Sequence, residues 1–270
     1  MNNMRLISRK NPFNQKSKNI VINNLGEEYY WIGEFGYFNL NILSFLESYD
    51  MKLTIHTYPD SCYIISNMFP NRFILNEIPL NMLRKRDTLR KINSQTYNTN
   101  NMTSLSSFVN GDPVNDINYN FTYLTKQISS SYNEDIDNFI CYFPRYRYYN
   151  GISKNDNWVA RNSTKDECMT VINTFNKKYK VVIVGNEILP FDYNNYDNVI
   201  VSDSLEKTIF YLKKCNFLIS NDSGFVDFAK NCGVKKVLIL RIQMLYHLRF
   251  NPFNTTVISI SNIKELNNYI

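Results

Sequence analysis

The sequence predicts an α/β protein whose parallel sheets carry helices on both faces. Short apolar runs rich in β-branched residues alternate with amphipathic stretches along most of the chain, which is typical of such sheets. The alternation stops between residues 93 and 116, where Asn, Ser, Thr, Gly and Pro dominate, a composition typical of loops and linkers. We therefore expect two Rossmann-like domains facing a cleft, 1–130 and 131–270, with an Asn/Ser-rich linker that begins at about residue 94.

The first half is expected to hold few strands before the linker, so its domain is reduced. The expected strands cover 18–24, 51–58 and 72–75, and the expected helices cover 35–49, 61–69 and 80–92. The last of these helices is basic, which fits a solvated helix face. A further helix at 121–128 is expected to bridge the two halves.

The second half shows the alternation more clearly. Apolar runs predict strands at 138–143, 180–184, 198–201, 217–220, 237–240 and 256–260, and the segments between them predict helices at 163–179, 205–215, 224–232 and 262–269. Thr164 and Glu167 have the spacing of a capping box at the start of one helix. Gly233 marks the end of another.

Composition limits the class of protein and its surroundings. The chain has 270 residues, 44% hydrophobic and 20% charged, as in globular proteins. The net charge of +6 is scattered along the chain, so nucleic acid is not an expected partner. We find no signal peptide and no membrane span. The five dispersed cysteines suit a reducing compartment, so we expect a cytoplasmic protein. The excess of Asn, Ile, Lys and Tyr suggests an AT-rich genome such as that of a giant virus, in which case the host cytoplasm or the virion is its location.

A polar turn follows the strand expected at 217–220. Residues 221–224 read Asn-Asp-Ser-Gly, at a carboxyl end of the sheet, where ligands of doubly wound folds bind. Gly224 permits close approach of a ligand, and the free N–H groups of the following helix favour an anion such as a diphosphate. The alternative is that Asp222 or Ser223 only caps this helix.

The segment SNDSGFVDFAKNCGVKKVLIL, residues 220–240, resembles a stretch of the lipopolysaccharide heptosyltransferases and related GT-B glycosyltransferases. The resemblance implies a GT-B fold whose C-terminal domain binds a nucleotide sugar. It also implies that Asp222, Ser223 and Gly224 lie at the donor diphosphate. Asp227 stands where the family has a histidine, and the resemblance places it at the diphosphate as well.

Residues 32–37, Ile-Gly-Glu-Phe-Gly-Tyr, resemble the family's turn before the first long helix of the N-terminal domain. The resemblance implies that Glu34 is the general base of an inverting transfer, which takes the proton of the acceptor hydroxyl. The alternative is that Glu34 is a first-turn acid that complements the helix dipole.

Further donor contacts are implied by two other segments. After the strand at 138–143, Arg145, Arg147 and Lys154 would neutralise the leaving diphosphate in place of a metal ion; the alternative is a solvated basic loop. Gly185 and Asn186, after the strand at 180–184, match a turn beside the nucleoside, unless they form a plain turn.

Taken together, these features predict a metal-independent glycosyltransferase without a tightly bound cofactor, acting on a glycan or glycoconjugate acceptor. No metal-ligand spacing, Walker A sequence or GxGxxG motif is present, and the two histidines, His56 and His247, lie far apart. A nucleotide-sugar epimerase or hydrolase on the same fold is one alternative. Another is a non-catalytic GT-B protein with a binding or structural role, which Asp227 and the short first half favour.

Overall fold

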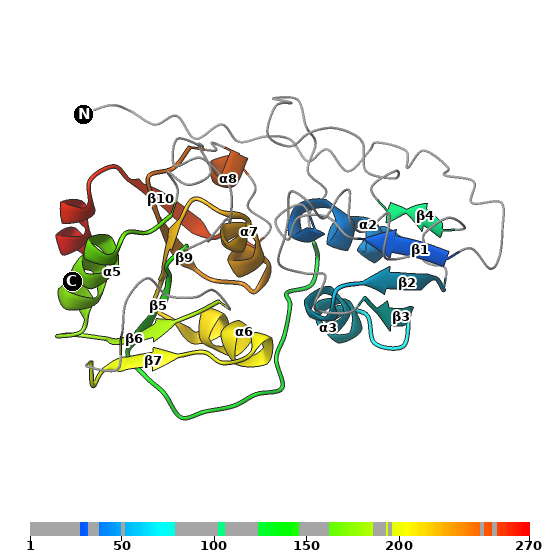
Figure 1. The fold of residues 1–270 in the computed structure, drawn as a ribbon, viewed down its shortest axis with the longest axis horizontal. Helices are drawn as coiled ribbons and strands as arrows, with labels where there is room; N and C mark the ends of the chain where they lie inside the picture. Colours follow the sequence, from blue (N-terminus) through cyan, green and yellow to red (C-terminus); the bar gives the residue numbers. More distant parts are fainter. Residues whose placement is uncertain are drawn as a thin grey trace.

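The computed structural model describes residues 28–31, 38–49, 52–78, 102–105, 124–145, 162–185, 193, 196–243, 246–249 and 253–270. These residues form two parallel β-sheets with helices packed against them (Figure 1). The predicted α/β fold with parallel sheets is confirmed. The strand expected at 18–24 and the helix expected at 80–92 lie outside the described residues.

The first sheet contains four strands in the order β3-β2-β1-β4, and all of its pairings are parallel. A π-helical turn, η1, leads into α2, and Pro59 begins α3, where its missing N–H costs no hydrogen bond. The elements are β1 (Glu28–Trp31), η1 (Phe38–Ile42), α2 (Leu43–Ser48), β2 (Thr54–Thr57), α3 (Pro59–Met68), β3 (Ile74–Glu77) and β4 (Met102–Ser104).

The second sheet contains six parallel strands in the order β10-β9-β8-β5-β6-β7. From the central β5 the chain first builds outward through β6 and β7, then returns to the other side of β5 for β8, β9 and β10. The order therefore reverses between β5 and β8, which makes their carboxyl ends the topological switch point. The elements are β5 (Phe139–Phe143), α5 (Lys165–Phe175), β6 (Lys180–Ile183), β7 (Val199–Val201), α6 (Leu205–Lys214), β8 (Leu218–Asn221), α7 (Gly224–Asn231), β9 (Lys236–Leu240), α8 (Tyr246–Arg249), β10 (Thr256–Ile260) and the 3₁₀ helix η5 (Ile263–Tyr269).

Local sequence signals set the ends of these helices. The capping box predicted for α5 is present, because Thr164 Oγ1 accepts from Glu167 N and the Glu167 carboxylate accepts from Thr164 N. At the end of α7, Gly233 has φ +84°; its N–H donates to Lys230 O while Val234 N donates to Ala229 O. This is a Schellman motif, which explains why glycine ends the helix there.

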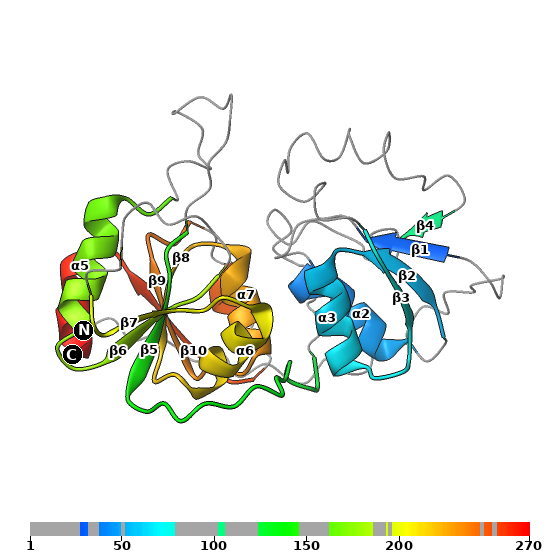
Figure 2. The same ribbon diagram turned by 60° about the horizontal axis from the view of Figure 1, so that its bottom comes forward.

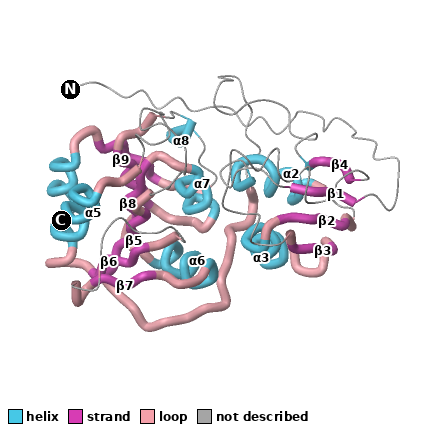
Figure 3. Tube along the Cα trace, viewed as in Figure 1, coloured by secondary structure: helices cyan, strands magenta, loops and turns pink. Residues whose placement is uncertain are grey.

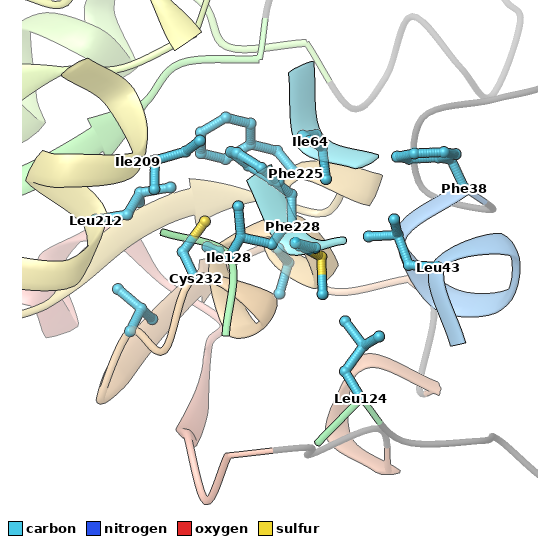
Figure 4. Packing of buried hydrophobic residues seen from close by; sticks show 14 of the residues in the cluster. Phe38, Leu43, Ile64, Leu124, Ile128, Ile209, Leu212, Phe225, Phe228 and Cys232 are labelled. Carbon is cyan, nitrogen blue, oxygen red and sulfur yellow. The ribbon is translucent and has the colours of Figure 1, made fainter. Parts of the chain in front are cut away.

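One hydrophobic core runs across both halves of the molecule. Helices α5 and η5 cover one face of the second sheet, and α6 and α7 cover the face turned toward α2 and α3 (Figure 2). Phe38 and Ile64 of the first half belong to the same buried cluster as Phe228 of α7 (Figure 4). In addition, Asn231 Nδ2 donates to Asn39 O at 2.8 Å in a buried hydrogen bond. The described parts of the two halves are therefore packed together rather than separated by water.

An extended connection, residues 124–137, joins the two sheets (Figure 3). The helix expected over 121–128 is wrong for its described residues. The Glu47 carboxylate of α2 accepts from Thr125 N at 2.8 Å, and Ile128 N donates to Asn231 O of α7 at 2.9 Å. These backbone groups are satisfied by neighbouring helices, so no local helix is needed to pair them.

Three short elements depart from the expected pattern. β4 lies inside the segment expected to be linker, and it is stabilised by parallel pairing with β1 rather than by its own sequence. β1 itself, at Glu28–Trp31, and α8, at Tyr246–Arg249, were not predicted. Elements of three or four residues carry too few side chains for a periodic pattern.

Candidate functional site

The carboxyl edge of the second sheet gathers most of the described residues that the sequence singled out. Arg145 follows β5, Gly185 follows β6, and Asp222, Ser223 and Gly224 follow β8. Because all six strands are parallel, these residues share one edge, and Arg145 and the 222–224 turn flank the switch point. Of the other expected site residues, Glu34, Arg147, Lys154 and Asn186 lie outside the described residues; Glu34 falls between the end of β1 and the start of η1.

A network of buried polar groups links the ends of β5 and β8. Arg145 is only 1% exposed, and its Nη1 donates to Asn162 Oδ1 at 2.9 Å. Ser163 N donates to Arg145 O at 2.6 Å, and Ser163 Oγ donates to Asn221 Oδ1 at 2.9 Å. The segment before α5 therefore fastens the two strand ends that form the switch point.

Arg241 adds a second guanidinium group at this edge. It follows β9 with φ 52°, a backbone conformation uncommon for a non-glycine residue. Its Nη2 lies 3.1 Å from Asn162 O and 2.7 Å from Glu167 Oε2, and its side chain is half exposed. Asn162 thus binds both Arg145 and Arg241. Arg241 was missed in the sequence, although a charged residue directly after the apolar run 237–240 was a usable signal.

The start of α7 places a helix N-terminus at this edge of the sheet. Ser223 is its N-cap, with Oγ accepting from Phe225 N at 3.3 Å, so this residue does cap the helix. Gly224 is the first residue of the helix. Among the described glycines, only Gly185 and Gly233 have a positive φ, so the backbone conformation does not require glycine at 224. Its missing side chain leaves room for close approach to the helix N-terminus.

Asp222 and Asp227 both face His247 of α8. His247 Nε2 lies 2.8 Å from Asp222 Oδ1, and Nδ1 lies 3.0 Å from Asp227 Oδ1. All three side chains are buried. Burial lowers the pKa of His247, but the Asp227 charge and the hydrogen bonds to both aspartates outweigh it, and the pKa is raised above its ordinary 6.5. The Asp222 and Asp227 carboxylates are thus engaged inside the protein.

Lys230 of α7 completes this buried cluster. Its Nζ donates to His247 O and lies 3.8 Å from Asp227 Oδ1. Burial lowers the pKa of Lys230 to about 8, although the Asp227 charge acts in the opposite direction. The part played by His247 was missed in the sequence, because 20 and 25 residues separate it from the two aspartates and no local pattern marks contacts over that separation.

Gly185 has a packing reason of its own. A Cβ atom there would lie 2.5 Å from Cε2 of Phe143, and the residue has φ +108°. The Phe143 ring is stacked on Phe225 of α7, with centroids 4.0 Å apart. Glycine at 185 therefore lets the turn after β6 pass over this aromatic pair, whether or not a nucleoside also binds there.

A surface hollow lies at the opposite edge of the same sheet. Some of its lining residues precede β5 and the others lie on α6, which precedes β8, so the hollow lies at the amino ends of these strands. The lining residues are Asn133, Glu134, Asp135, Ile136, Phe210 and Lys214. Glu134 accepts from Tyr211 Oη at 2.6 Å; burial first, and then this hydrogen bond, raise the pKa of Tyr211. These contacts tie the connection between the sheets to α6. The hollow is separate from the switch point.

Among the described residues, no group of three or more His, Cys, Asp or Glu side chains is arranged to hold a metal ion. None of the described helices is long and apolar enough to cross a membrane.

Comparison with solved structures identifies the fold. The E. coli heptosyltransferase WaaC, solved with ADP, matches 89% of this chain and 97% of its own, with 8% identity and a TM-score of 0.56. The same enzyme with ADP-2-deoxy-2-fluoro heptose gives a TM-score of 0.51 at 8% identity, over 89% of this chain and 96% of its own. The glycosyltransferase TibC of enterotoxigenic E. coli matches 87% of this chain and 61% of its own, with 10% identity and a TM-score of 0.50. No protein-family model matches the sequence, and no curated protein matches it. At such identities the likeness concerns the fold, and it confirms the predicted GT-B type.

Proposed function

We propose that this protein is a glycosyltransferase that takes a nucleotide-diphosphate sugar as donor and binds its diphosphate at the switch point of the second sheet. The observation that carries the proposal is that Arg145 and the N-terminus of α7 follow the carboxyl ends of two neighbouring strands, β5 and β8. Both favour anions, the arginine by its charge and the helix start by the positive end of the helix dipole. The solved WaaC complexes, which contain ADP and an ADP-heptose analogue, support a nucleotide sugar as the ligand.

Each residue has a chemical part in this proposal. The backbone at Gly224 receives the diphosphate, and the Arg145–Asn162–Arg241 network supplies positive charge, joined by Arg147 and Lys154. This charge stabilises the diphosphate as its bond to the anomeric carbon breaks, without need of a metal ion. Glu34 takes the proton of the acceptor hydroxyl as its oxygen bonds to the anomeric carbon from the opposite side, which inverts the configuration.

A second candidate is a GT-B protein that binds without catalysis. The observation in its favour is that Asp222 and Asp227 are buried against His247 instead of facing an open cleft. Such a protein would still bind a nucleoside diphosphate, or a relative of it, but would release no nucleotide from sugar nucleotides. Turnover therefore separates the two candidates.

Binding is tested first by thermal shift and calorimetry with ADP, UDP, GDP and CMP. A ligand at a hundredfold excess over its dissociation constant stabilises the native state by about 2.7 kcal/mol. Gly224→Val should weaken nucleoside diphosphate binding about tenfold or more while the melting temperature without ligand is retained, because one lost charge-assisted hydrogen bond is worth about 1.5–3 kcal/mol. Binding that is unchanged by Gly224→Val contradicts the proposed site.

The charged residues are tested against a matched surface variant. Arg147→Ala and Lys154→Ala should weaken binding, whereas Lys178→Ala, beyond the end of α5 and before β6, removes the same charge at the opposite edge and should not. If the protein turns over a sugar nucleotide, Glu34→Gln should slow it about 10²–10⁴-fold with donor affinity retained. Turnover unaffected by Glu34→Gln rules out this residue as the base.

A further inference from the structure

The cluster around His247 adjoins the proposed diphosphate site. Asp222 directly precedes the Ser223 cap, and Asp227 lies in the first turn of α7. His247 reaches this helix from α8 and contacts both aspartates through opposite ring nitrogens, at 2.8 and 3.0 Å. Asp222 Oδ2 also accepts from Gln243 N at 2.6 Å, which fastens the chain between β9 and α8 to the same turn.

The geometry determines where the protons lie. A neutral imidazole carries one N–H, and an ionised carboxylate can only accept a hydrogen bond. Two carboxylates on opposite ring nitrogens are therefore both satisfied only when both nitrogens carry a proton. His247 is thus an imidazolium as long as Asp222 and Asp227 are ionised.

This proton decides the charge behind the turn. The described charged groups that face His247 are Asp222, Asp227 and Lys230. When His247 and Lys230 are both charged, they offset the two carboxylates within this described cluster. Loss of the His247 proton makes the buried cluster next to Ser223 and Gly224 more negative by one charge. Because the cluster is buried away from water, its negative charge is poorly screened and opposes a bound anion.

We propose that His247 is a positioning residue whose protonation controls nucleoside diphosphate binding. When His247 is protonated, it neutralises Asp222 and Asp227 and holds the Ser223–Gly224 turn for the diphosphate. When it is deprotonated, the turn repels the diphosphate. This inference rests on the proposed function, since it concerns the same site. It also explains how two aspartates can lie beside a diphosphate site. Position 227 holds an aspartate where the resembled family has a histidine, and here the imidazole comes from His247 of α8 instead.

The expected effect is a steep pH dependence of affinity. For one linked proton, the dissociation constant rises by up to about tenfold per pH unit above the pKa of His247 in the free protein. Lys230, with its pKa lowered to about 8, titrates in the same cluster and steepens the upper part of the profile. A variant at His247 separates the two groups.

The test combines calorimetry and NMR on the full chain between about pH 5.5 and 8.5. ADP, UDP and GDP serve as probes, and the histidine rings are labelled with ¹⁵N. The protein has two histidines, so His56→Gln, on β2 of the first sheet, assigns the signals and is the matched control. We expect both ring nitrogens of His247 to be protonated at neutral pH, and the binding midpoint to coincide with the His247 pKa read by NMR.

His247→Gln should bind the nucleoside diphosphate about tenfold more weakly at pH 6 and lose this part of the pH dependence, while His56→Gln keeps the wild-type profile. The terminal phosphate titrates equally in every variant and cancels in the comparison. If His247→Gln does not fold, Asp227→Asn provides a second test: it should lower the His247 pKa, and the pH dependence of binding should move to lower pH and become weaker, because one of the two carboxylates that oppose the anion is gone.

The outcomes separate this inference from the proposed function. Binding by the wild type with a pH profile that His247→Gln or Asp227→Asn leaves unchanged overturns the inference alone. A single protonated ring nitrogen at pH 6 overturns it as well. No binding of ADP, UDP or GDP by the wild type at any pH overturns the proposed function, and the inference with it.

Discussion

Removing the Phe228 ring should destabilise both halves of the protein together. Phe228 of α7 is fully buried, and its ring lies 5.5 Å from that of Phe225, in the cluster that also contains Phe38 and Ile64 of the first half. Truncating a buried phenylalanine to alanine costs about 3–5 kcal/mol. In a chain of this size each kcal/mol lowers the melting temperature by about 2–4 °C, so Phe228→Ala should lower it by about 6–20 °C.

The assay needs a separate probe for each half. The chain has two tryptophans, and in a Trp158→Phe background the buried Trp31 of β1 reports on the first sheet alone, while far-ultraviolet circular dichroism reports on the whole chain. Since the core is shared, both midpoints should fall by the same amount. Phe175→Ala is the matched control, because it removes a ring of the same size from the separate cluster between α5 and the second sheet. A Trp31 midpoint that stays unchanged in Phe228→Ala would refute the shared core.

Three further predictions concern single contacts. Thr164→Ala removes the capping box of α5 and should lower stability to urea by about 1 kcal/mol, whereas Thr164→Ser should not. Gly233→Ala should cost about 1–2 kcal/mol for the left-handed backbone plus a clash, because its Cβ would lie 2.4 Å from the Gln127 side chain; Gln127→Ala should remove only the clash. Because the pKa of His247 is raised, its contribution to stability is complete below pH 6.5 and is lost as the pH rises through its folded-state pKa. The pKa of Lys230 is lowered from 10.5 to about 8, so this residue makes stability rise with pH between these two values. Urea midpoints of the wild type and His247→Gln, measured from below pH 6.5 to above pH 8, separate the two contributions.

The sequence predicted the parts of the fold that local chemistry determines. β5 is a run of five buried residues, which only a central strand allows, and the capping box of α5 follows from the spacing of Thr164 and Glu167. The position of the 221–224 turn at a carboxyl end followed from the alternation of strands and helices. These signals lie within a few residues of one another, so they can be read without knowing the tertiary structure.

The remaining features depend on contacts between distant residues. His247 contacts Asp222 and Asp227 only because the chain after β9 returns over α7. Asn162 joins Arg145 to Arg241 because β9 and the segment before α5 end at the same edge. The strand β4 exists through pairing with β1. None of these contacts leaves a local pattern in the sequence. Arg241 is different, because ligands of parallel sheets bind at the carboxyl ends of the strands, and inspecting every expected strand end would have included it.

The most direct test of the central claim is hydrogen exchange of the full chain with and without a bound nucleoside diphosphate, followed by mass spectrometry. A diphosphate at the switch point should protect the amides at the start of α7, residues 223–226, and those at the end of β5, where Arg145 lies. Protection confined to the hollow lined by Asn133 and Lys214, or none at the carboxyl edge of the second sheet, would contradict a donor site there.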